Sequence, residues 1–114
     1  MRRALALAVA LAGGLFPLAR SGAVLAQAAD PVTEGQALVE MYCADCHAVG
    51  RTGDSLLPAA PRFRELYWRY DVEFLSEALV EGIVTAHPDM PQYEFDPEQA
   101  AAIVAYLKSR RSRE

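Results

Sequence analysis

Two cysteines and a histidine lie within five consecutive residues of this 114-residue chain. Cys43 and Cys46 are its only cysteines and His47 follows directly, which gives the pattern C-x-x-C-H. Thiols three positions apart point to the same side of a helical turn, so each can bond one vinyl group of the same porphyrin. The neighbouring imidazole can then bind the iron. The pattern predicts covalent attachment of one haem c through Cys43 and Cys46, with His47 as an axial ligand.

Other uses of a cysteine pair fit the sequence less well. A thioredoxin-like dithiol needs a βαβ setting, and no Val- or Ile-rich strand precedes Cys43. A zinc site needs four ligands, and only His87 is left to complete one. A redox or structural disulfide stays open as an alternative, because disulfides form in exported proteins.

The second axial ligand is sought in residues 85–91, Thr-Ala-His-Pro-Asp-Met-Pro. Met1 lies in a predicted signal peptide, and Met41 is too close to the cysteine pair to reach the opposite haem face. Met90 is therefore the predicted sixth ligand, and a thioether there raises the potential of an electron carrier. Ligation by His87, or an iron with an open position, are the alternatives.

The N-terminus has the form of an export signal. Arg2 and Arg3 precede an apolar run over 4–19, and small residues follow. The run is shorter than the ~20 residues of a spanning helix. We expect residues 1–26 to be a cleaved secretory signal peptide, leaving one haem domain over 27–114 without a membrane span. Haem attachment needs thiols kept reduced by a maturation system, which favours a periplasmic location. We also expect the protein to be a monomer.

The charge balance argues against some partners. The chain has 15 acidic and 11 basic residues and a formal net charge of −4, and loss of the signal peptide removes three arginines more. Such a protein is a poor nucleic-acid binder and is steered toward basic partner surfaces. One cluster of basic residues lies near the C-terminus, where a favourable interaction with the helix dipole is preferred over a docking patch. This cluster is Lys108, Arg110, Arg111 and Arg113.

Helical signals flank the motif. Thr33 to Gln36 has the form of a capping box, which predicts a helix from about Glu34 into the cysteine pair. Residues 48–61 are rich in Gly and Pro and predict a loop whose carbonyl at Pro58 or Pro61 orients His47.

The second half of the chain also has helical patterns. Residues 62–70 are aromatic and basic, and we expect them to pack around the haem, with a clamp on its carboxylates by Arg62 or Arg64 as the alternative. Asp71 is predicted to cap a helix that Gly82 ends, and Asp96-Pro97 to begin the last one. The predicted apolar faces are Phe74, Leu75, Ala78 and Leu79 for the first of these, and Ala100, Ile103, Val104 and Leu107 for the last.

These features together resemble the class I c-type cytochromes, small exported monohaem electron carriers. The likeness covers nearly all of 27–114 and includes Gly35, the C-x-x-C-H motif, Met90-Pro91 and Tyr106. It implies an all-α fold of about four helices around one haem, with Gly35 of the first helix packed against Tyr106 of the last where the two cross. Val39 stands where the family often has an aromatic residue, which predicts a looser contact there.

We therefore expect a periplasmic electron carrier that cycles one haem between Fe(II) and Fe(III), and not an enzyme. Its redox partners are expected to bind transiently. The alternative is a haem-bearing subunit of a periplasmic dehydrogenase or oxidase. A haem sensor or peroxidase would need an open iron site.

Overall fold

The part of the chain that the structure describes is all-helical. The structure is a computed structural model that describes residues 13–14 and 27–111; the predicted signal peptide over 1–26, apart from Gly13 and Gly14, lies outside the described residues. The helices of the described residues confirm the expected all-α fold class. The described elements are α1 (Pro31–Tyr42), α2 (Phe63–Arg69), the 3₁₀ turn η1 (Val72–Phe74), α3 (Leu75–Glu81) and α4 (Pro97–Arg110). No helix among them is long and apolar enough to cross a membrane.

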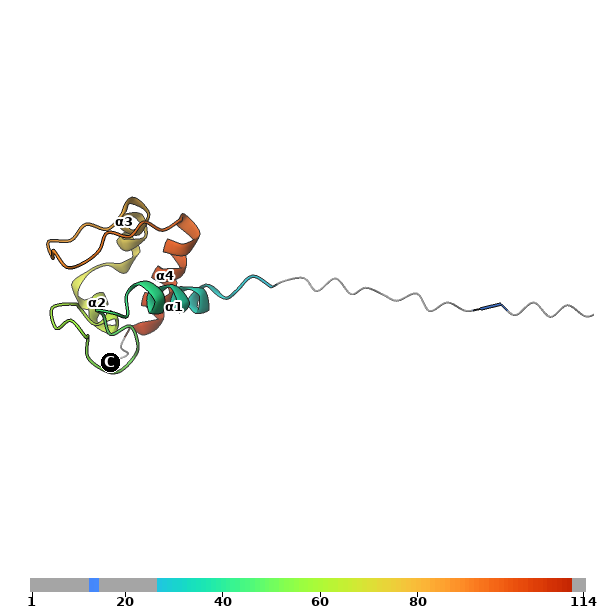
Figure 1. Ribbon diagram of the computed structural model, residues 1–114, viewed down its shortest axis with the longest axis horizontal. Coiled ribbons are helices and arrows are strands. Elements are labelled where there is room, and N and C mark those ends of the chain that lie inside the picture. The colour runs from blue at the N-terminus through green and yellow to red at the C-terminus, as the bar shows by residue number, and fades with distance from the viewer. Residues whose placement is uncertain (1–12, 15–26, 112–114) are drawn as a thin grey trace, which may run out of the picture.

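Helices α1 and α4 cross at the centre of the domain (Figure 1). Gly35 is buried at this crossing, and a Cβ added there would meet the backbone of Ala102 and lie 2.8 Å from the Cβ of Tyr106. The predicted packing of Gly35 against Tyr106 is confirmed. Val39, one turn further along α1, is completely buried in the same core, so its smaller side chain still packs without exposure.

The two long helices differ in how well their starts follow the sequence signals. Helix α4 begins as predicted, with Asp96 and Gln99 forming a reciprocal capping box. The capping box predicted for α1 is wrong. Asp30 caps that helix by accepting a hydrogen bond from the backbone N–H of Thr33 at 3.1 Å, and Pro31 occupies the first helical position. The helix therefore begins three residues before Glu34.

The segment before α3 changes which side chains face the core. Asp71 caps η1 by accepting from the backbone N–H of Glu73 at 3.1 Å, and η1 leads directly into α3. A 3₁₀ turn has three residues per turn, so it shifts the phase of the apolar face. Val72 is buried, whereas Phe74 is 76% exposed, and the prediction of Phe74 as part of that face is wrong. Gly82 ends α3 with φ +88°, as predicted.

Helix α2 forms within the predicted segment 62–70, but only some of its side chains are buried in the protein core. Phe63 and Leu66 are buried. Trp68 and Tyr70 are 58% and 57% exposed on the protein surface, and their packing around the haem stays a prediction. Two long loops connect the helices, 43–62 before α2 and 82–96 after α3, and in Figure 1 the first runs along the bottom of the domain and the second along its upper left.

Candidate haem site

The C-x-x-C-H motif forms the turn that follows α1. Backbone bonds continue the helical path, from Cys43 N to Val39 O at 2.9 Å and from His47 N to Cys43 O at 2.8 Å. Cys43 and Cys46 are both half-buried and unbonded. Before haem is attached, burial raises the pKa of the Cys43 thiol to about 11.

His47 is oriented by the loop that follows it. Its Nδ1 lies 2.7 Å from the carbonyl oxygen of Pro61, which selects Pro61 over Pro58 among the sequence candidates. Because a carbonyl can only accept, Nδ1 carries the proton, and Nε2 is left with its lone pair for a metal. The ring of Phe63 packs against the imidazole with centroids 5.0 Å apart. Nε2 is thus the ring nitrogen of His47 that could bind a metal.

Polar contacts from three parts of the chain hold the residues directly after His47. Ala48 donates its N–H to Ser55 Oγ at 3.0 Å and accepts from Phe63 N at 2.9 Å. The Tyr106 hydroxyl donates to the carbonyl of Val49 at 2.7 Å, which ties α4 to the same segment. The sequence did not predict these roles of Ser55 and of the Tyr106 hydroxyl. Tyr106 and Val49 are 57 positions apart, so no local pattern identifies their hydrogen bond.

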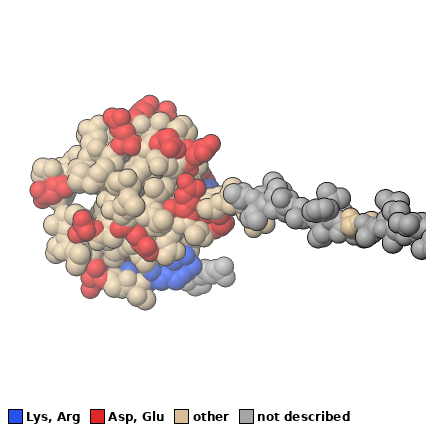
Figure 2. All heavy atoms as spheres, turned by 45° about the vertical axis from the view of Figure 1, so that its right-hand side comes forward, with Lys and Arg blue, Asp and Glu red and all other residues tan. Residues whose placement is uncertain are grey.

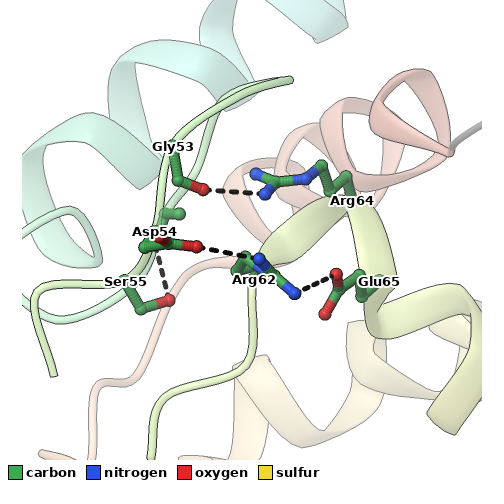
Figure 3. Close-up of polar contacts among 7 residues, drawn as sticks. Gly53, Asp54, Ser55, Arg62, Arg64 and Glu65 are labelled. Carbon is green, nitrogen blue, oxygen red and sulfur yellow. Dashed lines mark hydrogen bonds and ion pairs between the residues drawn. The ribbon is translucent and has the colours of Figure 1, made fainter. Parts of the chain in front are cut away.

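Arginines at the start of α2 close the same loop from outside (Figure 3). Arg62 Nη1 lies 2.8 Å from Asp54 Oδ1, and its Nη2 lies 2.6 Å from Glu65 Oε1. Arg64 donates to the carbonyl of Gly53 at 2.7 Å. The structure thus uses both arginines to fasten the loop that carries Pro61, and the clamp on haem carboxylates stays a prediction.

Met90 is carried by the loop that joins α3 to α4. Its side chain is half-buried, and its N–H donates to the carbonyl of His87 at 3.2 Å in a tight turn. At the base of the loop the N–H of Phe95 donates to the carbonyl of Leu79 at 2.9 Å. Both sequence candidates for the sixth ligand therefore lie in one turn of a loop that is closed at its base.

Aromatic contacts connect the Met90 loop to the C-x-x-C-H segment. The ring of Tyr42, the last residue of α1, meets the rings of Tyr93 and Phe95 edge to face, with both centroid distances 5.3 Å. Tyr42 directly precedes Cys43, and Tyr93 follows Met90 by three residues. The structure thereby brings the two predicted ligand segments together. Sequence analysis missed this cluster, although aromatic residues beside both ligand segments were a signal for it.

The donor set fits a haem c. Two thiols lie on one turn with an imidazole beside them whose outer nitrogen is available, and a thioether stands in a neighbouring loop. Zinc would need a closer gathering of ligands, and among the residues that the structure describes no three His, Cys, Asp or Glu side chains form such a group. The chemistry of the site is that of covalent haem attachment.

The fold and this donor set define a c-type cytochrome. The family model described as cytochrome C oxidase, cbb3-type, subunit III matches residues 30–107, and the chain belongs to this family of c-type cytochromes. A relative named cytochrome c-552, from Bradyrhizobium diazoefficiens, is 35% identical over 78 residues, which cover 68% of this chain and 72% of the relative. No solved structure matches the chain. Its cofactor is haem c, and its general role is haem-based electron transfer.

Proposed function

We propose that this protein is a periplasmic one-electron carrier in which Cys43 and Cys46 would hold the haem and His47 and Met90 would bind its iron. The haem iron supplies the redox chemistry by alternating between Fe(II) and Fe(III). The observation that carries the proposal is the 2.7 Å contact between His47 Nδ1 and the Pro61 carbonyl, because it fixes the tautomer needed for iron binding. Two thioether bonds would retain the cofactor outside the cytoplasm.

The protein side chains favour rapid electron exchange by keeping the ligands still. Hydrogen bonds hold the segment after His47, and the closed loop base limits the positions open to Met90. When neither ligand moves between oxidation states, little reorganisation accompanies electron transfer. The family suggests an electron carrier rather than an enzyme.

The charge pattern supports basic redox partners. Residues 71–98 contain eight acidic residues, and no Lys or Arg occurs between positions 70 and 107. Figure 2 shows Asp and Glu spread over most of the visible face, with Lys and Arg gathered at one edge. A partner with a basic surface is attracted to the side of α3 and the Met90 loop, and salt weakens this attraction. Such partners bind briefly through small interfaces.

A second candidate role is the haem-bearing subunit of a periplasmic dehydrogenase or oxidase complex. The name of the matching family, an oxidase subunit, favours it. Purification from the native host distinguishes the two roles. A carrier elutes alone, whereas a subunit elutes with a partner in fixed stoichiometry at physiological salt.

Carbon monoxide binding tests the closed iron site. The reduced holoprotein at neutral pH, without denaturant, is expected to bind carbon monoxide very slowly, because Met90 already fills the sixth position. A redox titration of the same sample is expected to follow a single one-electron curve. Immediate and complete carbon monoxide binding would instead support the sensor or peroxidase interpretation.

A further inference from the structure

Three aromatic rings join the two segments that carry the proposed iron ligands. Tyr42 contacts Tyr93 and Phe95, each at a centroid distance of 5.3 Å and with interplanar angles of 60° and 83°. Tyr93 and Phe95 lie 6.3 Å apart, so the three rings form one cluster. Edge-to-face pairs of this kind are attractive beyond the area that they bury. The cluster thus connects the end of α1 to the chain just after Met90.

One ring of the cluster is fixed and two are near the surface. Phe95 is 7% exposed and belongs to the core, and its N–H is bonded to Leu79. Tyr42 and Tyr93 are 39% and 36% exposed. Tyr42 is not one of the residues of the buried core cluster, and it reaches that cluster through its contact with Phe95.

The Met90 loop has few other fastenings. Within the described part of the chain, the hydrogen bonds of residues 83–91 join partners inside that segment: Thr85 with His87, and Met90 with His87. These bonds shape the turn but do not tie it to another element. At its base the loop is closed by the bond from Phe95 N to the Leu79 carbonyl and by a long bond, 3.5 Å, from the Gln92 side chain to the Gly82 carbonyl. The aromatic cluster adds the contact that joins the part of the loop after Met90 to α1.

We propose that Tyr42 is a positioning residue that keeps Met90 on the iron. Its ring holds the part of the loop that follows Met90, at Tyr93 and Phe95, against the end of α1, directly before the cysteine pair. We call these two ring contacts the latch. When this latch opens, the loop can move away and leave the sixth position free for a small ligand. The inference rests on the proposed ligation by Met90 and adds to it the residue that sets how often the iron becomes accessible.

The experiment measures the rate of carbon monoxide binding to the reduced holoprotein at neutral pH. Tyr42→Leu removes both ring contacts, and two aromatic pairs are strong enough for an expected rate increase of about tenfold. Tyr42→Phe keeps the rings and is expected to bind at the wild-type rate. Tyr93→Leu opens the latch from the other side and is expected to accelerate binding in the same direction.

A matched control comes from α2. Tyr67 is 36% exposed, meets Trp68 edge to face at 5.2 Å and also contacts the guanidinium of Arg111 through its ring and its hydroxyl. Tyr67→Leu therefore removes at least as many ring contacts as Tyr42→Leu, at a place far from the Met90 loop in sequence. It is expected to leave the rate unchanged. Equal acceleration by Tyr67→Leu, or wild-type rates for both Tyr42→Leu and Tyr93→Leu, would overturn the latch.

The near-infrared spectrum separates failure of the latch from failure of the proposed ligation. The oxidised wild-type protein is expected to show the thioether-to-iron charge-transfer band. If the wild type lacks that band and binds carbon monoxide at once, the Met90 ligation itself is wrong. If the wild type has the band and the Tyr42 and Tyr93 variants behave like it, only the latch is wrong.

Discussion

The loop after His47 and the loop around Met90 are stabilised by different kinds of contact. The His47 side is held by hydrogen bonds and ion pairs that reach it from the loop itself, from α2 and from α4. The Met90 side is held by aromatic rings and by a closed loop base. Directional bonds fix an imidazole and its tautomer, whereas a flexible thioether needs only to be kept near the iron. The comparison predicts one rigid ligand and one that can be released.

The largest loss of stability is expected at the crossing of α1 and α4, because this crossing supports both the His47 loop and the Met90 loop. Gly35→Ala places a Cβ against the backbone of Ala102, which cannot move without separating α1 from α4. Unfolding free energy should fall by about 3 kcal/mol, and both iron ligands should be lost together. Denaturant unfolding followed by circular dichroism and haem absorbance measures this. Gly50→Ala is the control, because an added Cβ there has no atom within 4 Å, and loss of one ligand well before the other in Gly35→Ala would contradict a shared frame.

A smaller effect separates the two loops. Gly82 has φ +88° at the start of the Met90 loop, and an added Cβ would lie 2.7 Å from Gln92 Nε2. Gly82→Ala should cost about 2 kcal/mol and speed carbon monoxide binding. Gly53→Ala has similar backbone strain, with φ +86°, in the loop after His47 but no crowding. It should cost less and leave that rate unchanged, and the reverse order of the two rates would refute the division between the loops.

Tyr106→Phe tests the hydrogen-bonded side. The variant leaves the Val49 carbonyl without its 2.7 Å donor, so stability should fall by about 1 kcal/mol while carbon monoxide binding stays slow.

Desolvation is the main cause that raises the pKa of Tyr106 above its ordinary value of 10.0. The folded protein therefore holds this proton more tightly than the unfolded chain, and that contribution is complete below pH 10.0 and is lost as pH rises through the raised value.

The pH profile of unfolding measures that contribution. Wild-type stability should decline more steeply above pH 10.0 than that of Tyr106→Phe. If the stabilities of the two proteins decline in parallel above pH 10.0, the ionisation of the Tyr106 hydroxyl does not contribute to the pH dependence of folding.

The smallest effect is expected at the ion pairs of Arg62. The side chains of Arg62 and Asp54 are 38% and 89% exposed, so water screens their attraction. Arg62→Gln should lower the unfolding temperature slightly at low salt and not measurably at 1 M salt. Thermal unfolding at the two salt concentrations measures this. A loss that persists at 1 M salt would mean that Arg62 acts by packing instead.

Local signals in the sequence predicted those parts of the fold that local contacts decide. Asp96 and Gln99 are close in sequence and cap α4 as expected. The start of α1 was misjudged because two capping patterns overlap, and Asp30 with Pro31 prevails over Thr33. The exposed Phe74 was misjudged because a 3₁₀ turn changes the helical phase.

The site shows the same division. The spacing of the cysteine pair and His47 predicts them as site residues, and Met90 is predicted because the other two methionines are excluded. The choice between Pro58 and Pro61 needed the geometry, since both are prolines of one loop. The contacts of Tyr42 and Tyr106 join segments about 50 residues apart, and no local pattern specifies them.

The near-infrared spectrum of the oxidised holoprotein tests the central claim most directly. Recorded at neutral pH for the wild type and for Met90→Ala and His87→Ala, it reports the sulfur ligand of the iron. We predict the thioether-to-iron band in the wild type and in His87→Ala, and its loss in Met90→Ala. A wild type without the band, or a Met90→Ala protein that keeps it, would contradict the pairing of a rigid His47 with a releasable Met90.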